Sequence, residues 1–201
     1  MLSKLILSGL SLVSLGLTAL GADYTYVAES EPSAFSDANT VTSMIQGNWV
    51  LGCTSFAPST SWPPDDSQSA VYTYSFSGND FTWVIQNFSD TKCKKPLYSR
   101  AYKGTFKVAD PIPGLENVYG IDLLNIAVTY KLLDPSARVY DFCGSGDNVL
   151  TGESQCTGSD LFQILRPDSR FLRFGAFINY TDGDSPDSRP RFLSDGLYNR
   201  Q

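Results

Sequence analysis

The chain has 201 residues, a formal net charge of −6 and no histidine. A negative chain lacks the basic face that phosphate binding requires, so we expect no nucleic-acid partner. The lack of histidine removes Ser-His-Asp and Cys-His catalysis and the commonest zinc ligand. The chain is rich in aromatic residues, with 12 Phe, 11 Tyr and 3 Trp. This composition is typical of β proteins with ligand cavities.

The N-terminal segment has the features of a secretory signal peptide. Lys4 is the only charge before Asp23, and an apolar run extends from Leu5 to Leu20. Small residues at Ala19 and Gly21 suit cleavage after Gly21. The alternative is a buried N-terminal helix. No later stretch is long enough to cross a bilayer, so we expect a secreted or periplasmic protein with no membrane span.

We expect three parts: a signal peptide at residues 1–21, an N-terminal lead at 22–44, and one domain at 45–201 that ends in a polar tail. A short helical turn is expected at residues 42–46. Beyond it, apolar side chains recur at every second residue, which predicts strands. Strands are expected at residues 47–53, 71–76, 81–88, 97–108 and 119–133, in a hairpin over 161–178 that turns at 167–169, and in a short segment at 137–142.

Seven or eight strands joined by hairpins, with almost no helical pattern, predict an all-β fold. A sandwich and a barrel are the two choices. Gly104 interrupts the alternation of its strand, which suits a bend or bulge, and the turn at residues 77–80 can take positive φ. Long strands with such a bend favour a barrel, which leaves no edge strand. We expect a single antiparallel up-and-down barrel of about eight strands.

The four cysteines should form two disulfides in an exported chain. They are Cys53, Cys93, Cys143 and Cys156, and three pairings are possible. We favour Cys53–Cys93, because neighbouring strands explain it, and Cys143–Cys156, because a short polar loop explains it. The rival interpretation is a zinc site, but the cysteine spacings fit no zinc motif. No pattern indicates a metal site or a cofactor.

Several short motifs occur in the order found in one known superfamily. The chain resembles lipocalin-type barrels, and especially their exported, disulfide-bearing members. These include the barrel domains of the adenomatosis polyposis coli down-regulated proteins that inhibit Wnt signals. The resemblance covers about residues 45–193, although the Cys143–Cys156 loop does not align with it. It is carried by GNWVLGC (47–53), YTYSFSGNDF (72–81), FSDTKCKKPLY (88–98), KGTF (103–106), and LRFGAF followed by RPRFL.

The resemblance implies structural roles for the first strand. Gly47 would let the chain turn tightly into the barrel floor, and Trp49 would plug the closed end with its apolar ring. An arginine from a late strand would lie over that ring in a cation–π contact. Arg173 is the first candidate for this arginine, and Arg166 is the second.

The alternating faces also predict a ligand site. Arg100 shares a face with tyrosines, and inside a barrel it would need a counter-charge or an anionic ligand such as a fatty-acid carboxylate. The alternatives are that Arg100 faces water and that the lumen is filled by side chains. The resemblance implies that the loop at residues 56–68, with Phe56 and Trp62, covers the ligand; the alternative is an ordinary exposed loop. The predicted ligand-binding residues are Tyr72, Tyr74, Phe76, Trp83, Tyr98, Arg100, Tyr102, Phe106, Phe56 and Trp62.

The resemblance, supported by the aromatic face, implies that the protein binds a small hydrophobic or amphipathic ligand, such as a lipid, fatty acid or pigment, in an aromatic-lined cavity. The first alternative is a filled barrel that binds a protein partner through loops 56–68 and 134–159. The lesser alternative is an isomerase or cyclase whose acid or base is Asp122 or Glu116, although no catalytic residue is assigned. Asn87 and Asn179 lie in sequons, which matter only in a eukaryotic host.

Overall fold

The computed structural model describes residues 37–56, 66–143, 149–176 and 183–201. These residues form one short α-helix, one 3-10 helix and nine strands, which are antiparallel throughout. Within this part of the chain, no helix is long and apolar enough to cross a bilayer. The elements are α1 (Ala38–Met44), β1 (Gly47–Ser55), β2 (Ser69–Ser77), β3 (Asp80–Phe88), β4 (Pro96–Pro111), β5 (Tyr119–Leu132), β6 (Glu153–Thr157), β7 (Leu161–Pro167), β8 (Phe171–Phe174), η1 (Pro186–Ser188) and β9 (Tyr198–Arg200).

Eight of the strands form a closed ring, so the all-β barrel expected from the sequence is confirmed. Consecutive strands β1 to β5 pair as neighbours, β5 then pairs with β7, and β9 joins β8 to β1. β6 lies outside the ring, against the second half of β5. Two of these strands were not expected: β6 was assigned to a loop, and β9 to the polar tail.

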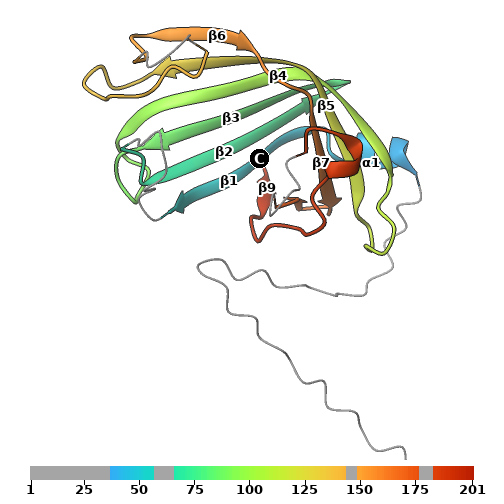
Figure 1. The fold of residues 1–201 in the computed structure, drawn as a ribbon. Coiled ribbons are helices and arrows are strands. Elements are labelled where there is room, and N and C mark those ends of the chain that lie inside the picture. The colour runs from blue at the N-terminus through green and yellow to red at the C-terminus, as the bar shows by residue number, and fades with distance from the viewer. Residues whose placement is uncertain (1–36, 57–65, 144–148, 177–182) are drawn as a thin grey trace, which may run out of the picture.

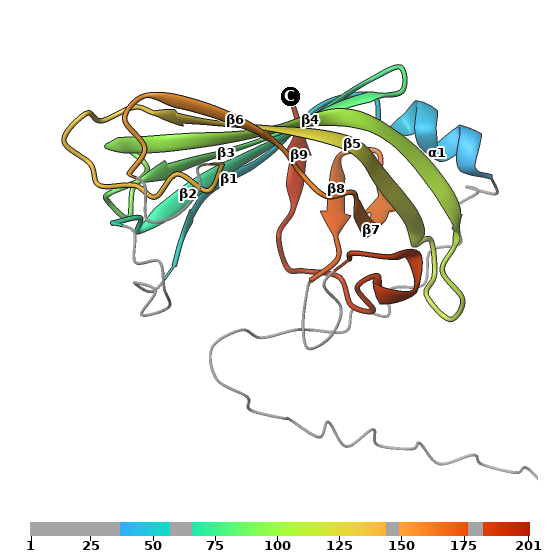
Figure 2. The same ribbon diagram turned by 45° about the horizontal axis from the view of Figure 1, so that its top comes forward.

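The ring is closed along only part of its length. β9 pairs with β1 only at Trp49 and Val50, and β7 pairs with β5 only over Tyr119–Leu123. Beyond these pairings, β1 to β6 continue as a curved sheet (Figures 1 and 2). We call this continuation the sheet extension. It exists because β7, β8 and β9 have 7, 4 and 3 residues, whereas β4 and β5 have 16 and 14.

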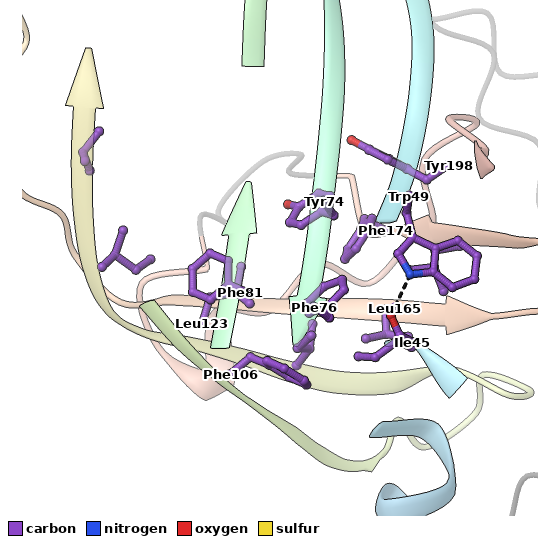
Figure 3. Packing of buried hydrophobic residues seen from close by; sticks show 14 of the residues in the cluster. Ile45, Trp49, Tyr74, Phe76, Phe81, Phe106, Leu123, Leu165, Phe174 and Tyr198 are labelled. Atoms are coloured by element: carbon purple, nitrogen blue, oxygen red, sulfur yellow. Dashed lines mark hydrogen bonds between the residues drawn. The ribbon is translucent and has the colours of Figure 1, made fainter. Parts of the chain in front are cut away.

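Side chains fill the closed part of the ring. Trp49 is fully buried there and its indole Nε1 donates a hydrogen bond to the carbonyl of Ile45 at 2.6 Å (Figure 3). Ile45 follows α1, whose Val41 is also fully buried. The helix therefore belongs to the barrel core, although the sequence placed it in the N-terminal lead. Residues packed around this core include Phe76, Phe81, Phe106, Leu123, Leu165 and Phe174.

The expected bend at Gly104 is a β-bulge. The pairing of β4 with β5 shifts register between Lys103 and Thr105. A Cβ atom on Gly104 would come within 2.3 Å of the carbonyl oxygen of Leu124, which no side chain tolerates. The missing side chain thus allows the two backbones to approach at the point where β4 curves.

Both favoured disulfides are present. Cys53 on β1 pairs with Cys93 in the β3–β4 connection, and Cys143 pairs with Cys156 on β6. The second bridge ties down the long β5–β6 connection. The short strand expected at residues 137–142 does not form. This segment contributes only an isolated bridge between Tyr140 and Val149.

Candidate ligand-binding surface inside the barrel

Strand register defines two rows of side chains that cross the inner face of the sheet. The Trp49 row, at the boundary of the closed ring, contains Trp49, Tyr74, Trp83, Tyr102, Val128 and Cys156. The Arg100 row is the next one toward the sheet extension and contains Leu51, Tyr72, Ile85, Arg100, Tyr130 and Ser154. Because side chains alternate between faces, both rows face inward together.

Three aromatic rings of the Trp49 row, those of Tyr74, Trp83 and Tyr102, form a continuous stack. The Trp83 ring lies 5.2 Å from Tyr74 and 4.9 Å from Tyr102, measured between ring centroids. Tyr74 also stacks on Phe174 of β8 at 4.3 Å. Stacked rings at these separations stabilise one another beyond the area that they bury. The stacked rings lie between the filled core and the sheet extension.

Burial divides the predicted ligand-binding residues into two groups. Tyr74, Phe76, Tyr98 and Phe106 are at most 5% exposed, so they have almost no free surface for a ligand. The half-buried members on the inner face are Tyr72, Trp83, Arg100 and Tyr102. Side chains that face inward and still contact solvent indicate that this part of the lumen is not completely filled.

The loop residues of the predicted site are less informative. Phe56 directly follows β1 and is 36% exposed. Trp62 lies outside the described residues. The expected covering role of these two aromatics therefore stays a prediction.

A different loop covers part of the inner face. Val139 and Leu150 of the β5–β6 connection are buried in the core cluster, and Phe142 stacks on Tyr130 at 5.6 Å. In Figure 2 this connection runs back beneath the strands. The Cys143–Cys156 bridge holds it there.

Arg100 is surrounded by tyrosines. The Tyr130 hydroxyl interacts with both Arg100 and Tyr102. Burial, together with the neighbouring Tyr102, raises the pKa of Tyr130 to about 12, although Arg100 acts in the opposite direction. Burial also raises the pKa of Tyr72, which Arg100 again opposes. These hydroxyls are therefore neutral near pH 7 and do not balance the guanidinium charge.

One structural expectation is wrong. The arginine over Trp49 is Arg200 of β9, whose guanidinium carbon lies 5.0 Å from the ring centroid. Arg173 and Arg166 face each other across β7 and β8, and Arg173 lies over Phe171 instead. The expectation failed because β9 was not recognised as a strand. Gly47, with φ of +108°, begins β1 as expected.

The proposed acid and base residues lie away from the inner face. Asp122 alternates with the inward-facing Ile121 and Leu123, and it forms an ion pair with Arg189. Arg189 also donates to the carbonyls of Ile121 and Gln163 and thereby anchors the C-terminal segment. Glu116 is exposed in the β4–β5 connection.

A shallow pocket of about 390 Å³ lies elsewhere, around the Gly104 bulge. It is lined by Asp80–Thr82, Lys103–Thr105 and Asn125, and it shares no residue with the predicted ligand set. Among the described residues, no group of acidic and cysteine side chains is arranged to hold a metal ion.

Two residues of the inner face were missed at the sequence level. Tyr130 was overlooked because its strand has apolar residues on both faces, so no face was assigned to it. Asn87 was treated only as a sequon, but it is 4% exposed on the inner face, opposite Ala70 and Tyr98. A glycan on Asn87 is incompatible with this packing. No family model matches the chain, and no curated protein matches its sequence.

Proposed function

We propose that this protein binds a small hydrophobic or amphipathic molecule on the inner face of the sheet extension. The observation that carries the proposal is the half-buried aromatic surface formed by Tyr72, Trp83 and Tyr102 on the inner face. Large apolar side chains left partly exposed in a concavity are typical of small-molecule sites. The sequence resemblance to lipocalin-type barrels supports the same function, and the two disulfides suit an exported carrier.

Binding of a neutral fluorescent probe such as Nile red tests this proposal. We expect saturable binding, because the probe replaces water on the aromatic surface. Trp83→Ala should weaken it by at least about 1 kcal/mol, or about fivefold, because a buried contact is lost. Phe192→Ala is the matched control, since Phe192 is 55% exposed in the C-terminal segment and should leave the probe affinity unchanged.

One result would contradict the role of Trp83, and another would contradict ligand binding as a whole. If folded Trp83→Ala keeps the wild-type affinity, Trp83 does not belong to the site. If the wild-type protein shows no saturable binding, a filled barrel becomes the better description. The interaction-module alternative would then lead, because Phe142 in the β5–β6 connection is 52% exposed and offers an apolar contact for a protein partner.

A further inference from the structure

Three N–H donors on the inner faces of β3 and β4 have no acceptor among the described residues. They are the indole Nε1 of Trp83, the amide Nδ2 of Asn87 and the Nε of Arg100, and all three atoms are buried. Buried donors are almost always hydrogen-bonded in native proteins, because an unsatisfied donor costs free energy. Each of the three therefore calls for an acceptor.

The three donors lie close together in the sheet. Arg100 is opposite Ile85 in the β3–β4 register, and Trp83 and Asn87 lie two positions to either side of Ile85. All of these side chains thus point to the same face, and Arg100 is the diagonal neighbour of both other donors. Diagonal neighbours are about 7–8 Å apart between backbones, within reach of long side chains. One small acceptor group can contact more than one of these donors.

Arg100 also has no carboxylate partner among the residues that the structure describes. The groups around it are Tyr98, Tyr102 and Tyr130. Asp141, on the nearby β5–β6 connection, is engaged by Ser154, whose hydroxyl donates to it at 2.5 Å. A half-buried cation whose described contacts are neutral tyrosines is stabilised by an anion.

We propose that Arg100, with Trp83 Nε1 and the Asn87 amide beside it, binds the carboxylate of an amphipathic ligand. The apolar part of that ligand packs on Tyr72, Trp83 and Tyr102. This inference rests on the proposed function and specifies its ligand class. A single guanidinium among neutral donors matches a single negative charge, which favours a carboxylate over a phosphate monoester, whose charge is about −1.5 to −2 at pH 7.

The test compares ligands that share one alkyl chain and differ only in the headgroup. Hexadecanoate, hexadecanol and methyl hexadecanoate each compete with Nile red for the wild-type protein at pH 8. We expect the carboxylate to bind at least about tenfold more tightly than the alcohol or the ester, because a charge-assisted hydrogen bond is stronger than a neutral one.

Variants then assign the preference to Arg100. Arg100→Met should remove the preference for the carboxylate over the alcohol and the ester. Arg191→Met is the matched control, because it removes the same charge from an exposed site and should keep the preference. Trp83→Phe keeps a ring without the N–H group and should reduce the preference by about two- to fivefold.

The possible results distinguish a failure of the carboxylate assignment from a failure of the proposed function. If the wild-type protein binds all three ligands equally, the carboxylate assignment is wrong and the hydrophobic site stands. If it binds none of them, and Nile red also fails, the proposed function is wrong. Tighter binding of hexadecyl phosphate than of hexadecanoate would overturn the choice of carboxylate. If Arg100→Met does not fold, Arg100→Lys is compared with the wild-type protein. Lysine keeps the positive charge, so this variant should retain part of the preference for the carboxylate over the alcohol.

Discussion

At the level of single residues, Trp49 connects the start of the barrel domain to the C-terminal strand. Its indole donates to the carbonyl of Ile45 beside α1, and its ring receives the guanidinium of Arg200 from the last strand. Arg200 also donates to the carbonyl of Gln46 at 2.8 Å. The C-terminus is thereby held against the start of β1, and this contact closes the end of the barrel at which β1 begins.

We predict that Arg200→Ala destabilises the protein by about 1–2 kcal/mol, because it removes a cation–π contact and a hydrogen bond. Chemical denaturation at neutral pH measures the change in the free energy of unfolding. Arg191→Ala is the control and should stay within about 0.5 kcal/mol of wild type, as is usual for exposed positions. If Arg173→Ala costs more than Arg200→Ala, then Arg200 is not the residue that stabilises the floor.

At the scale of elements, the β5–β6 connection covers the part of the sheet that the ring leaves open. It buries Val139 and Leu150 on the inner face, and the Cys143–Cys156 disulfide closes a loop with a sequence separation of 13. This connection did not align with the lipocalin-type pattern. Its packing explains how inward-facing residues outside the closed ring, such as Tyr130, become buried.

We predict that replacing both Cys143 and Cys156 with serine lowers the free energy of unfolding by about 3 kcal/mol on the loop-entropy estimate. The variant should also release a bound fluorescent probe faster, because the connection no longer holds its position over the site. Stopped-flow dissociation of Nile red measures the rate. The Cys53→Ser/Cys93→Ser variant should lose stability without this gain in rate. Equal release rates in both variants would mean that the connection does not cover the site.

At the scale of the whole molecule, stability should depend on pH mainly on the alkaline side. The chain has no histidine, while burial raises the pKa of Tyr74, Tyr198 and Tyr130, the last to about 12. Between the unfolded tyrosine pKa of about 10 and the raised folded values, the folded state binds more protons than the unfolded state. The stabilisation is therefore complete below about pH 10 and is lost as the pH rises above it.

We predict a free energy of unfolding that is nearly constant from about pH 6 to 9 and falls steeply from about pH 10 to 12. Denaturation curves across this range, with tyrosinate absorbance recorded in parallel, measure both changes. In Tyr130→Phe the slope should be smaller, because one of the raised groups is absent. A decline that begins near pH 8, or no decline up to pH 12, would contradict the assignment of these tyrosines as buried neutral groups.

Much of the architecture could be predicted from the sequence because it depends on neighbours in the chain. Alternation of apolar residues predicted β2, β3 and β4, since side chains on a strand point to opposite faces whatever the strand pairs with. Gly104 indicated the bulge, and the expected neighbouring strands and short polar loop favoured the two observed disulfides. The same alternation placed Tyr72, Trp83 and Arg100 on the aromatic faces of their strands, but it did not show whether these faces point inward.

Only the tertiary structure decided which distant residues meet. β9 has three residues, too few for a periodic pattern, so neither the closure of the ring nor the identity of Arg200 could be read locally. The register between β4 and β5 shifts between Lys103 and Thr105, and beyond this shift Tyr130 lies opposite Arg100. The three donors beside Ile85 became a candidate site only once the structure showed that they are buried and have no acceptor among the described residues. Local periodicity thus determines where the strands lie and which side chains share a face. Strand register and burial determine how the end of the barrel closes and which residues form the candidate ligand site.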